Sequence, residues 1–148
     1  MTQKLLNDEV VNQVSEVFNQ LQEPVAVLFF GRKSDCDYCG DTQQLVEEVT
    51  GISDKLNLYV YDLDEDEAVA KQYKVDKAPG LVLAGQDGDQ ILDYGLRYAG
   101  IPSGHEFSSL INDLILVSSR DSGLDKNTRD FLNELNEPVL LQVFVTPT

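Results

Sequence analysis

VAVLFFGRKSDCDYCG, residues 25–40, is the stretch of sequence that decides the fold. Its first six residues are all apolar, rich in β-branched and aromatic side chains, and bounded by Pro24 and Gly31. Such a run predicts a strand that is buried on both faces, as in a parallel sheet covered by helices. A polar loop with Cys36 and Cys39 follows, and helical periodicity begins directly after it.

The segments around this stretch alternate between helical and strand patterns. They predict helices over residues 3–21, 39–53 and 64–74, a strand over 56–61, and a hairpin of 81–83 and 91–92 around Asp87-Gly88. Ser103-Gly104-His105-Glu106 matches a capping box, which predicts a further helix beginning at Ser103. This order predicts an α/β thioredoxin-like fold: a central mixed β-sheet flanked by helices, with an extra N-terminal helix.

The composition excludes several classes of protein. The net charge is −15, with 11 basic residues against 26 acidic ones, so no basic face is expected for nucleic acid. The longest apolar run, residues 25–30, is far too short to cross a membrane. Residues 1–4 lead into the first amphipathic pattern without the features of a secretory signal, so we expect a cytoplasmic protein.

A short internal repeat divides the chain. Leu21–Phe30 (LQEPVAVLFF) recurs as Leu135–Phe144 (LNEPVLLQVF), with Glu, Pro, Val and Phe matched at a constant spacing. We therefore expect residues 1–119 to form one thioredoxin-like unit with the cysteine pair. Residues 120–148 would be a linker helix and the first strand of a truncated second thioredoxin-like unit. A chance match over so short a stretch is the alternative.

The spacing of the two cysteines indicates thiol–disulfide chemistry. Two cysteines so close together cannot staple a fold, which points to local chemistry. Cys36 would lie just before the helix, where unpaired N–H groups and the macrodipole favour a thiolate that attacks a substrate disulfide. Cys39, one turn into the helix, would then attack Cys36 and release the reduced product. We expect no cofactor other than this redox-active disulfide.

Charged neighbours of the first cysteine act in opposite directions. Arg32 and Lys33 should lower the pKa of its thiol. Asp35 and Asp37 should raise it, so we expect a thiol less acidic than in a strong oxidant, which favours a reductase. Tyr38, between the cysteines, either offers its ring to the substrate or merely covers the sulfurs.

Zinc is the main alternative for a Cys-x-x-Cys pair, because zinc knuckles use the same spacing. Zinc takes four ligands, and the only other soft ligand is His105. The strand order predicts His105 at the opposite end of the fold, where it caps a helix. We therefore predict no metal site within one chain, and a metal bridging Cys36 and Cys39 of two chains stays open.

Pro79 opens an apolar strand directly after Lys77-Ala78, where a proline is otherwise awkward. A cis bond after Ala78 would turn the start of the strand toward the cysteine loop and expose the Ala78 backbone to a substrate chain. An ordinary trans proline that starts a strand is the alternative. We interpret Tyr38, Ala78 and Pro79 as substrate-binding residues.

Together these features resemble a known family, the two-unit, glutaredoxin-like protein disulfide oxidoreductases. The resemblance is carried by Cys36-Asp37-Tyr38-Cys39, by Lys77-Ala78-Pro79 and by the run YGLRYAGIPSGHEF, residues 94–107. It implies that Cys36 is the nucleophile, Cys39 the resolving cysteine and Pro79 the cis-proline. It also implies protein disulfides as substrates and a thioredoxin-reductase-like protein as the electron donor.

The family has a second unit, typically with Cys-Pro-Tyr-Cys, and Val143–Thr148 resembles the approach to that motif. Without a second site, we expect disulfide exchange rather than two-site activities such as isomerisation. Gly80 is smaller than the resemblance suggests at this position, and we expect it to loosen the strand that binds substrate.

We predict a thiol–disulfide oxidoreductase that exchanges disulfides with protein substrates through Cys36 and Cys39. Residues 100–103 lack the paired glycines and acidic cap of a glutathione site, which favours protein substrates. The alternative is a non-catalytic thioredoxin-fold module. Such a module would bind partners through its sheet edge or self-associate through Val139–Val145, an apolar predicted strand.

Overall fold

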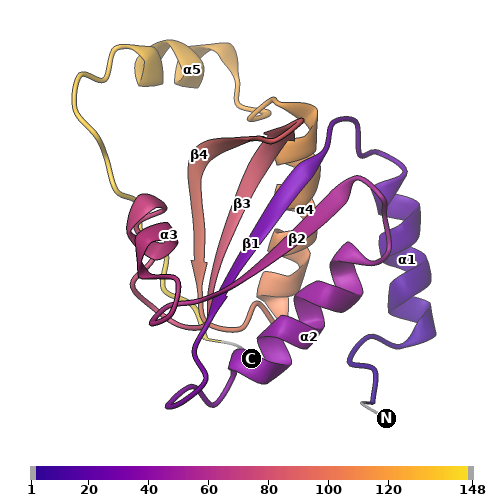
Figure 1. The fold of residues 1–148 in the computed structure, drawn as a ribbon. Helices are drawn as coiled ribbons and strands as arrows, with labels where there is room; N and C mark the ends of the chain where they lie inside the picture. The colour runs from indigo at the N-terminus through magenta and orange to yellow at the C-terminus, as the bar shows by residue number, and fades with distance from the viewer. Residues whose placement is uncertain (1–2, 147–148) are drawn as a thin grey trace.

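The strand predicted at residues 25–30 forms the centre of the sheet. In the computed structural model, which describes residues 3–146, β1 (Val25–Gly31) lies in a four-stranded sheet of order β2-β1-β3-β4 (Figure 1). β2 (Leu56–Asp62) runs parallel to β1. β3 (Gly80–Asp87) is antiparallel both to β1 and to β4 (Gln90–Ala99). All seven residues of β1 are buried, as predicted.

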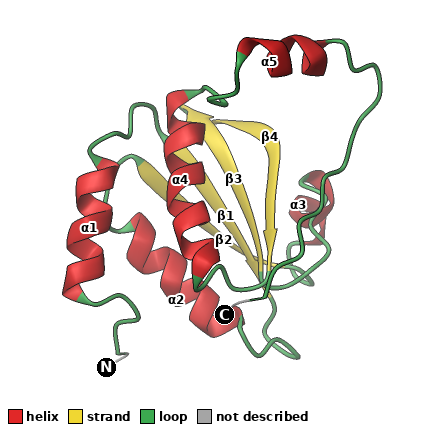
Figure 2. Ribbon diagram, turned by 180° about the vertical axis from the view of Figure 1, so that it is seen from behind, coloured by secondary structure: helices red, strands yellow, loops and turns green. Residues whose placement is uncertain are grey.

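Helices cover both faces of this sheet (Figure 2). They are α1 (Asp8–Phe18), α2 (Cys39–Thr50), α3 (Glu67–Gln72) and α4 (His105–Ser119), with α5 (Lys126–Asn133) standing apart from the sheet. Val27 and Phe29 of β1 face the larger core, with α1, α2 and α4. Leu28 and Phe30 face the smaller core, with α3. This arrangement is a thioredoxin-like fold, which confirms the predicted fold class.

α4 is held to the sheet by its apolar stripe. Leu110 and Leu114 are each 1 % exposed, and burying each stabilises the fold by roughly 1.5–3 kcal/mol. Ser118, fully buried at the end of the helix, donates its hydroxyl to the Glu23 carbonyl at 2.7 Å. Within residues 3–146, no helix is both long and apolar enough to cross a membrane.

α1 begins later than the helix predicted over residues 3–21. Asn7 caps it, because the Asn7 side chain accepts the N–H of Val10 at 2.9 Å. The chain ahead of this cap is tied to α2 instead, where the Glu48 carboxylate accepts the N–H groups of residues 5 and 6.

α3 is shorter than the helix predicted over residues 64–74, because local hydrogen bonds compete with its first turn. The Asp62 carboxylate accepts the N–H groups of Asp64 and Glu65 at 2.9 and 3.1 Å. These bonds hold a turn, and the helix starts only after it.

The predicted capping box at Ser103 is not formed. α4 starts at His105, and no side chain caps it. Gly104 has a φ of +62°, which lies outside the helical region. This positive φ favours glycine. The predicted hairpin is confirmed, with residues 88 and 89 between its paired strands.

The chain after α5 is extended and exposed. It runs back from one end of the sheet to the other, where β4 ends and α4 begins (Figures 1 and 2). The strand predicted over Val139–Val145 is wrong for this structure: these residues pair with no other described strand, and a strand without a partner is not stable. The assignment of residues 120–148 to a second unit stays a prediction, and residues 147 and 148 lie outside the described range.

Candidate redox site

The two cysteines form a disulfide at the point where β1 leads into α2. Their Cα atoms are 5.5 Å apart. Cys39 is the first residue of α2, rather than one turn into it as predicted, and it is 7 % exposed. Cys36, in the loop, is half-buried. Cys36 is therefore the more exposed residue of the pair.

The first turn of α2 fixes the cysteine loop. The carbonyl of Tyr38 accepts hydrogen bonds from the backbone N–H of Thr42 at 2.9 Å and from its hydroxyl at 2.7 Å. Thr42 is fully buried, so water does not compete for these bonds. Backbone N–H groups at the start of a helix favour a thiolate nearby. The Tyr38 side chain is 59 % exposed, and its contact with substrate stays a prediction.

Arg32 and Lys33 are held by acidic residues that follow β2. Arg32 donates to Asp64 at 3.0 Å, and Lys33 pairs with Glu65. The Glu65 carboxylate accepts a hydrogen bond from the Lys33 ammonium group, and this bond raises the pKa of Lys33. These ion pairs therefore offset much of the effect that the sequence predicted Arg32 and Lys33 to have on the thiol of Cys36.

The turn after β2 also supports the start of the cysteine loop. The N–H of Leu63 donates to the carbonyl of Gly31 at 2.9 Å. The N–H groups that Asp62 accepts from Asp64 and Glu65 lower the pKa of its carboxyl. Sequence reasoning missed this support. The sequence signal for it was the basic pair Arg32-Lys33 after β1 and the acidic run 62–66 after β2. Neighbouring parallel strands end at the same edge of a sheet, so these two segments lie close together.

An open cleft of about 510 Å³ lies beside the disulfide. Its lining includes both cysteines, Gln43 of α2, Tyr61 of β2 and carboxylates of the turn after β2. The disulfide is therefore reached from a hollow whose walls come from three different elements.

The Ala78–Pro79 peptide bond is cis, as predicted. The register places Gly80 opposite Phe30, so Pro79 lies beside the point where β1 leads into the cysteine loop. The carbonyl of Pro79 accepts the N–H of Gly100 at 2.8 Å, which ties it to the end of β4. Binding of substrate by Ala78 and Pro79 stays a prediction.

Gly80 does not loosen this region as the sequence suggested. A Cβ at this position would lie 2.7 Å from the carbonyl oxygen of Lys77 and 2.9 Å from Cγ1 of Val75. Both contacts are closer than a methyl group allows, so glycine is required for close packing here.

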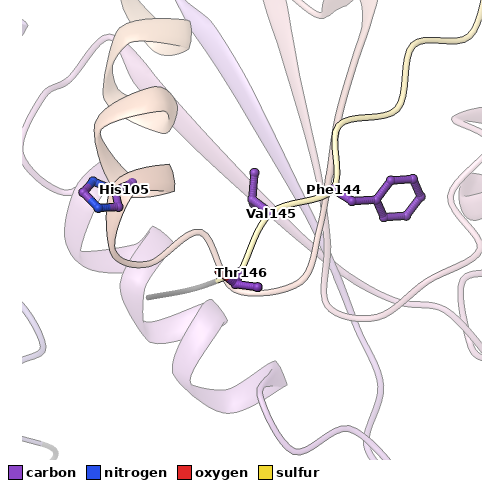
Figure 3. Close-up of a pocket in the computed structure, with 4 residues that line it drawn as sticks. All are labelled: His105, Phe144, Val145 and Thr146. Carbon is purple, nitrogen blue, oxygen red and sulfur yellow. The ribbon is translucent and has the colours of Figure 1, made fainter.

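His105 lies at the same end of the sheet as the cysteine loop, not at the opposite end as predicted. β4 is antiparallel to β3 and hence parallel to β1, so both strands end at one edge, and α4 starts there. His105 and the tail residues Phe144, Val145 and Thr146 line an open pocket, and Figure 3 shows the rings of His105 and Phe144 pointing away from each other. Among the described residues, no group of three or more His, Cys, Asp or Glu is arranged to hold a metal ion.

A thioredoxin-like fold whose central strand leads into a Cys-x-x-Cys disulfide defines the class of thioredoxin-like redox proteins. No family model matches the chain. The chain is similar to the F component of alkyl hydroperoxide reductase from Pseudomonas aeruginosa, with 27 % identity over 121 residues. This similarity covers 82 % of the chain but only 20 % of that protein.

Comparison with solved structures also finds similar redox proteins. A protein disulfide oxidoreductase from Aeropyrum pernix has a TM-score of 0.78 and 27 % identity, covering 87 % of this chain and 55 % of its own. The NTD_N/C domain of alkylhydroperoxide reductase from Enterococcus faecalis has a TM-score of 0.73 and 27 % identity, covering 84 % and 58 %. A Trichomonas vaginalis thioredoxin, at 17 % identity and a TM-score of 0.50, shows the fold alone.

The resemblance to protein disulfide oxidoreductases is thus confirmed at the level of structure, and the chain spans little more than half of these two relatives. Both relatives are oxidoreductases. This chain shares their fold and has a Cys36–Cys39 disulfide of the Cys-x-x-Cys kind.

Proposed function

We propose that this chain exchanges disulfides with protein substrates through Cys36 and Cys39. The observation that carries the proposal is the asymmetry of the pair: Cys36 is a half-buried loop residue, and Cys39 is only 7 % exposed at the start of α2. This asymmetry supports a role for Cys36 in attack on the substrate and for Cys39 in resolution.

In the reducing direction, the Cys36 thiolate forms a bond with one sulfur of the substrate disulfide. The other substrate sulfur leaves as a thiolate and takes up a proton. Cys39, as a thiolate, then attacks the Cys36 sulfur, and the second substrate sulfur leaves. Two electrons pass to the substrate, and the Cys36–Cys39 disulfide is restored with no bound cofactor.

Substrate binding is proposed for the residues next to this disulfide. Pro79 lies beside the end of β1, and the backbone of Ala78 precedes it, where an extended substrate chain could pair with it. The exposed ring of Tyr38 adds apolar surface on the loop itself.

We propose that the chain acts as a reductase in the cytoplasm. Asp35 and Asp37 flank Cys36 and disfavour its thiolate, which opposes the helix end and suits a moderately low reduction potential. A thioredoxin-reductase-like protein would return the electrons.

An insulin-reduction assay with dithiothreitol as donor tests the proposal. Wild-type protein should accelerate precipitation of the insulin B chain, and Cys36→Ser should fall to the rate of dithiothreitol alone. Ser34→Ala, in the same loop but without a sulfur, should keep the wild-type rate. Equal rates for wild type and Cys36→Ser would sink the proposal.

The exposed tail favours a second candidate function, association through Val139–Val145. Leu140, Leu141 and Phe144 are 79 %, 86 % and 89 % exposed, which is unusual for apolar side chains in succession. An apolar segment of this kind invites pairing with a sheet edge of another chain. Light scattering should then give a smaller number of chains per particle for a protein that lacks residues 136–148, and an unchanged oligomeric state would refute the association.

A further inference from the structure

We propose that the redox site selects disulfides flanked by lysine or arginine, because Cys36 is surrounded by uncompensated carboxylates. The inference rests on the disulfide exchange proposed above and adds the class of substrate to it. The acidic rim, as we call it, consists of residues 32–41 around the cysteines and the turn 62–66 beside them.

The acidic rim carries a strong excess of negative charge. Its two segments hold seven carboxylates and only two basic side chains, Arg32 and Lys33. Both basic groups are occupied by Asp64 and Glu65 of the same rim. The basic groups therefore leave most of the negative charge without compensation.

The carboxylates nearest the cysteines have no cationic partner in the part of the chain that the structure describes. Within residues 3–146, no Lys, Arg or His nitrogen lies within 4.0 Å of the carboxylates of Asp35, Asp37 and Asp41. All three residues are exposed, two of them on either side of Cys36 and the third in the first turn of α2. Their negative charges therefore act on a molecule that approaches the disulfide from solvent.

When a substrate disulfide reaches Cys36, the residues that flank this disulfide in the substrate enter the acidic rim. The substrate's disulfide must reach the half-buried Cys36, and the cleft beside that residue is lined by the carboxylates of Asp62, Glu65 and Asp66. Arg32 and Lys33 also line the cleft, but both are paired with carboxylates of the rim. Residues flanking the substrate disulfide therefore come within the screening length of several carboxylates, about 8–10 Å at ordinary salt. Basic flanks are attracted and acidic flanks repelled, which acts mainly on the rate of association.

Basic flanks also assist the chemical step. When the Cys36 thiolate bonds to one substrate sulfur, the other leaves as a thiolate within the rim. A lysine ammonium or arginine guanidinium group next to that sulfur stabilises its negative charge, a role that the chain's own paired Arg32 and Lys33 cannot readily fill.

Two disulfide peptides that differ only in their flanking residues, lysine in one and glutamate in the other, test the inference. The reduced protein is mixed with each peptide, the reaction is stopped with acid, and second-order rate constants are taken from the separated products. At low ionic strength the lysine peptide should react about tenfold faster or more, and the ratio should fall toward one at high salt.

A pair of matched variants locates the effect. Asp35→Asn/Asp37→Asn should lower the ratio of the two rates at least about threefold. Asp87→Asn/Asp89→Asn removes the same charge from the hairpin at the other end of the sheet and should leave the ratio unchanged. The ratio is the readout because a change in thiol reactivity alone alters both rates alike.

Equal rates for the two peptides in the wild type, or a ratio that the rim variant leaves unchanged, would overturn the inference while disulfide exchange stands. Failure of both peptides to react would instead overturn the proposed function, and the inference with it.

Discussion

Gly80 and Gly40 both lie close to the redox site, yet their surroundings differ at the level of single atoms. A Cβ on Gly80 would meet the Lys77 carbonyl oxygen at 2.7 Å, whereas a Cβ on Gly40 would have nothing within 4 Å. The first glycine allows the chain to pass tightly at the start of β3. The second lies in the first turn of α2 and is not required for packing.

Gly80→Ala should therefore lower the free energy of unfolding by about 1–3 kcal/mol, because backbone must move to admit the methyl group. Gly40→Ala should leave it unchanged or raise it by up to about 1 kcal/mol, because alanine favours the helix. Urea denaturation measures both. Equal stability of the two variants would contradict this account of Gly80.

Asp93 and Arg97 of β4 form another local unit. The Arg97 guanidinium donates to both carboxylate oxygens of Asp93, at 2.7 and 2.8 Å, and its Nε donates to the Tyr73 carbonyl at 2.9 Å. The hydrogen bond from Arg97 lowers the pKa of Asp93. A carboxyl with a lowered folded-state pKa stabilises the fold above its unfolded pKa of about 3.9, and this contribution is lost as the pH falls through the folded value.

Asp93→Asn should thus lower stability at neutral pH, by no more than about 1 kcal/mol because the pair is partly exposed. The difference from wild type should shrink as the solution is acidified below about pH 4. Urea denaturation at several pH values measures it, and a difference that stays constant with pH would contradict the assignment.

At the residue scale, sequence reasoning identified Cys36, Cys39 and the cis bond before Pro79, because spacing and position beside a strand carry that information. It missed the pairing of Arg32 with Asp64, and it misplaced His105. Both depend on which strand ends meet at one edge of the sheet, and that is known only once the strand order is known.

At the scale of elements, α1 and α5 have the same kind of cap but differ in packing. The side chain of Asn7 accepts the N–H of Val10 at 2.9 Å, and that of Asp125 accepts the N–H of Thr128 at 2.8 Å. α1 buries Val14 and Phe18 in the main core, whereas α5 buries none of its residues. Loss of each cap therefore has a different consequence for the whole fold.

Asn7→Ala should lower the free energy of unfolding by about 0.5–2 kcal/mol, the usual effect of removing an N-cap. Asp125→Ala removes an equivalent cap, but it should leave global unfolding nearly unchanged because α5 unfolds without disturbing the core. Thermal unfolding followed by circular dichroism measures both variants. An equal loss of stability would show that α5 is coupled to the sheet.

The sequence predicted most elements, because long apolar runs such as residues 25–30 are explicit. It placed their ends less well. The turn after β2 and the start of α4 depend on the Asp62 carboxylate and on Gly104 (φ +62°), which periodicity does not report. The strand predicted at Val139–Val145 had the right composition but no partner among the described strands, and pairing rather than composition makes a strand.

At the scale of the whole molecule, the parallel alignment of β1, β2 and β4 gathers the redox features at one end of the sheet. The cysteine loop, the acidic turn after β2, the start of β3 with Pro79 and the start of α4 all lie there. The net charge of −15 is consequently more than a solubility feature, since part of it surrounds Cys36.

Trapping of the mixed disulfide tests the central claim most directly. Reduced Cys39→Ser and Cys36→Ser proteins are each incubated with a disulfide-bonded protein substrate, and the intact masses are then measured. The account predicts a stable covalent adduct of substrate with Cys39→Ser, linked through Cys36, because the second thiol that would release it is absent. Cys36→Ser should form none. An adduct through Cys39 in the Cys36→Ser protein, or no adduct with either variant, would contradict the claim that Cys36 attacks protein disulfides.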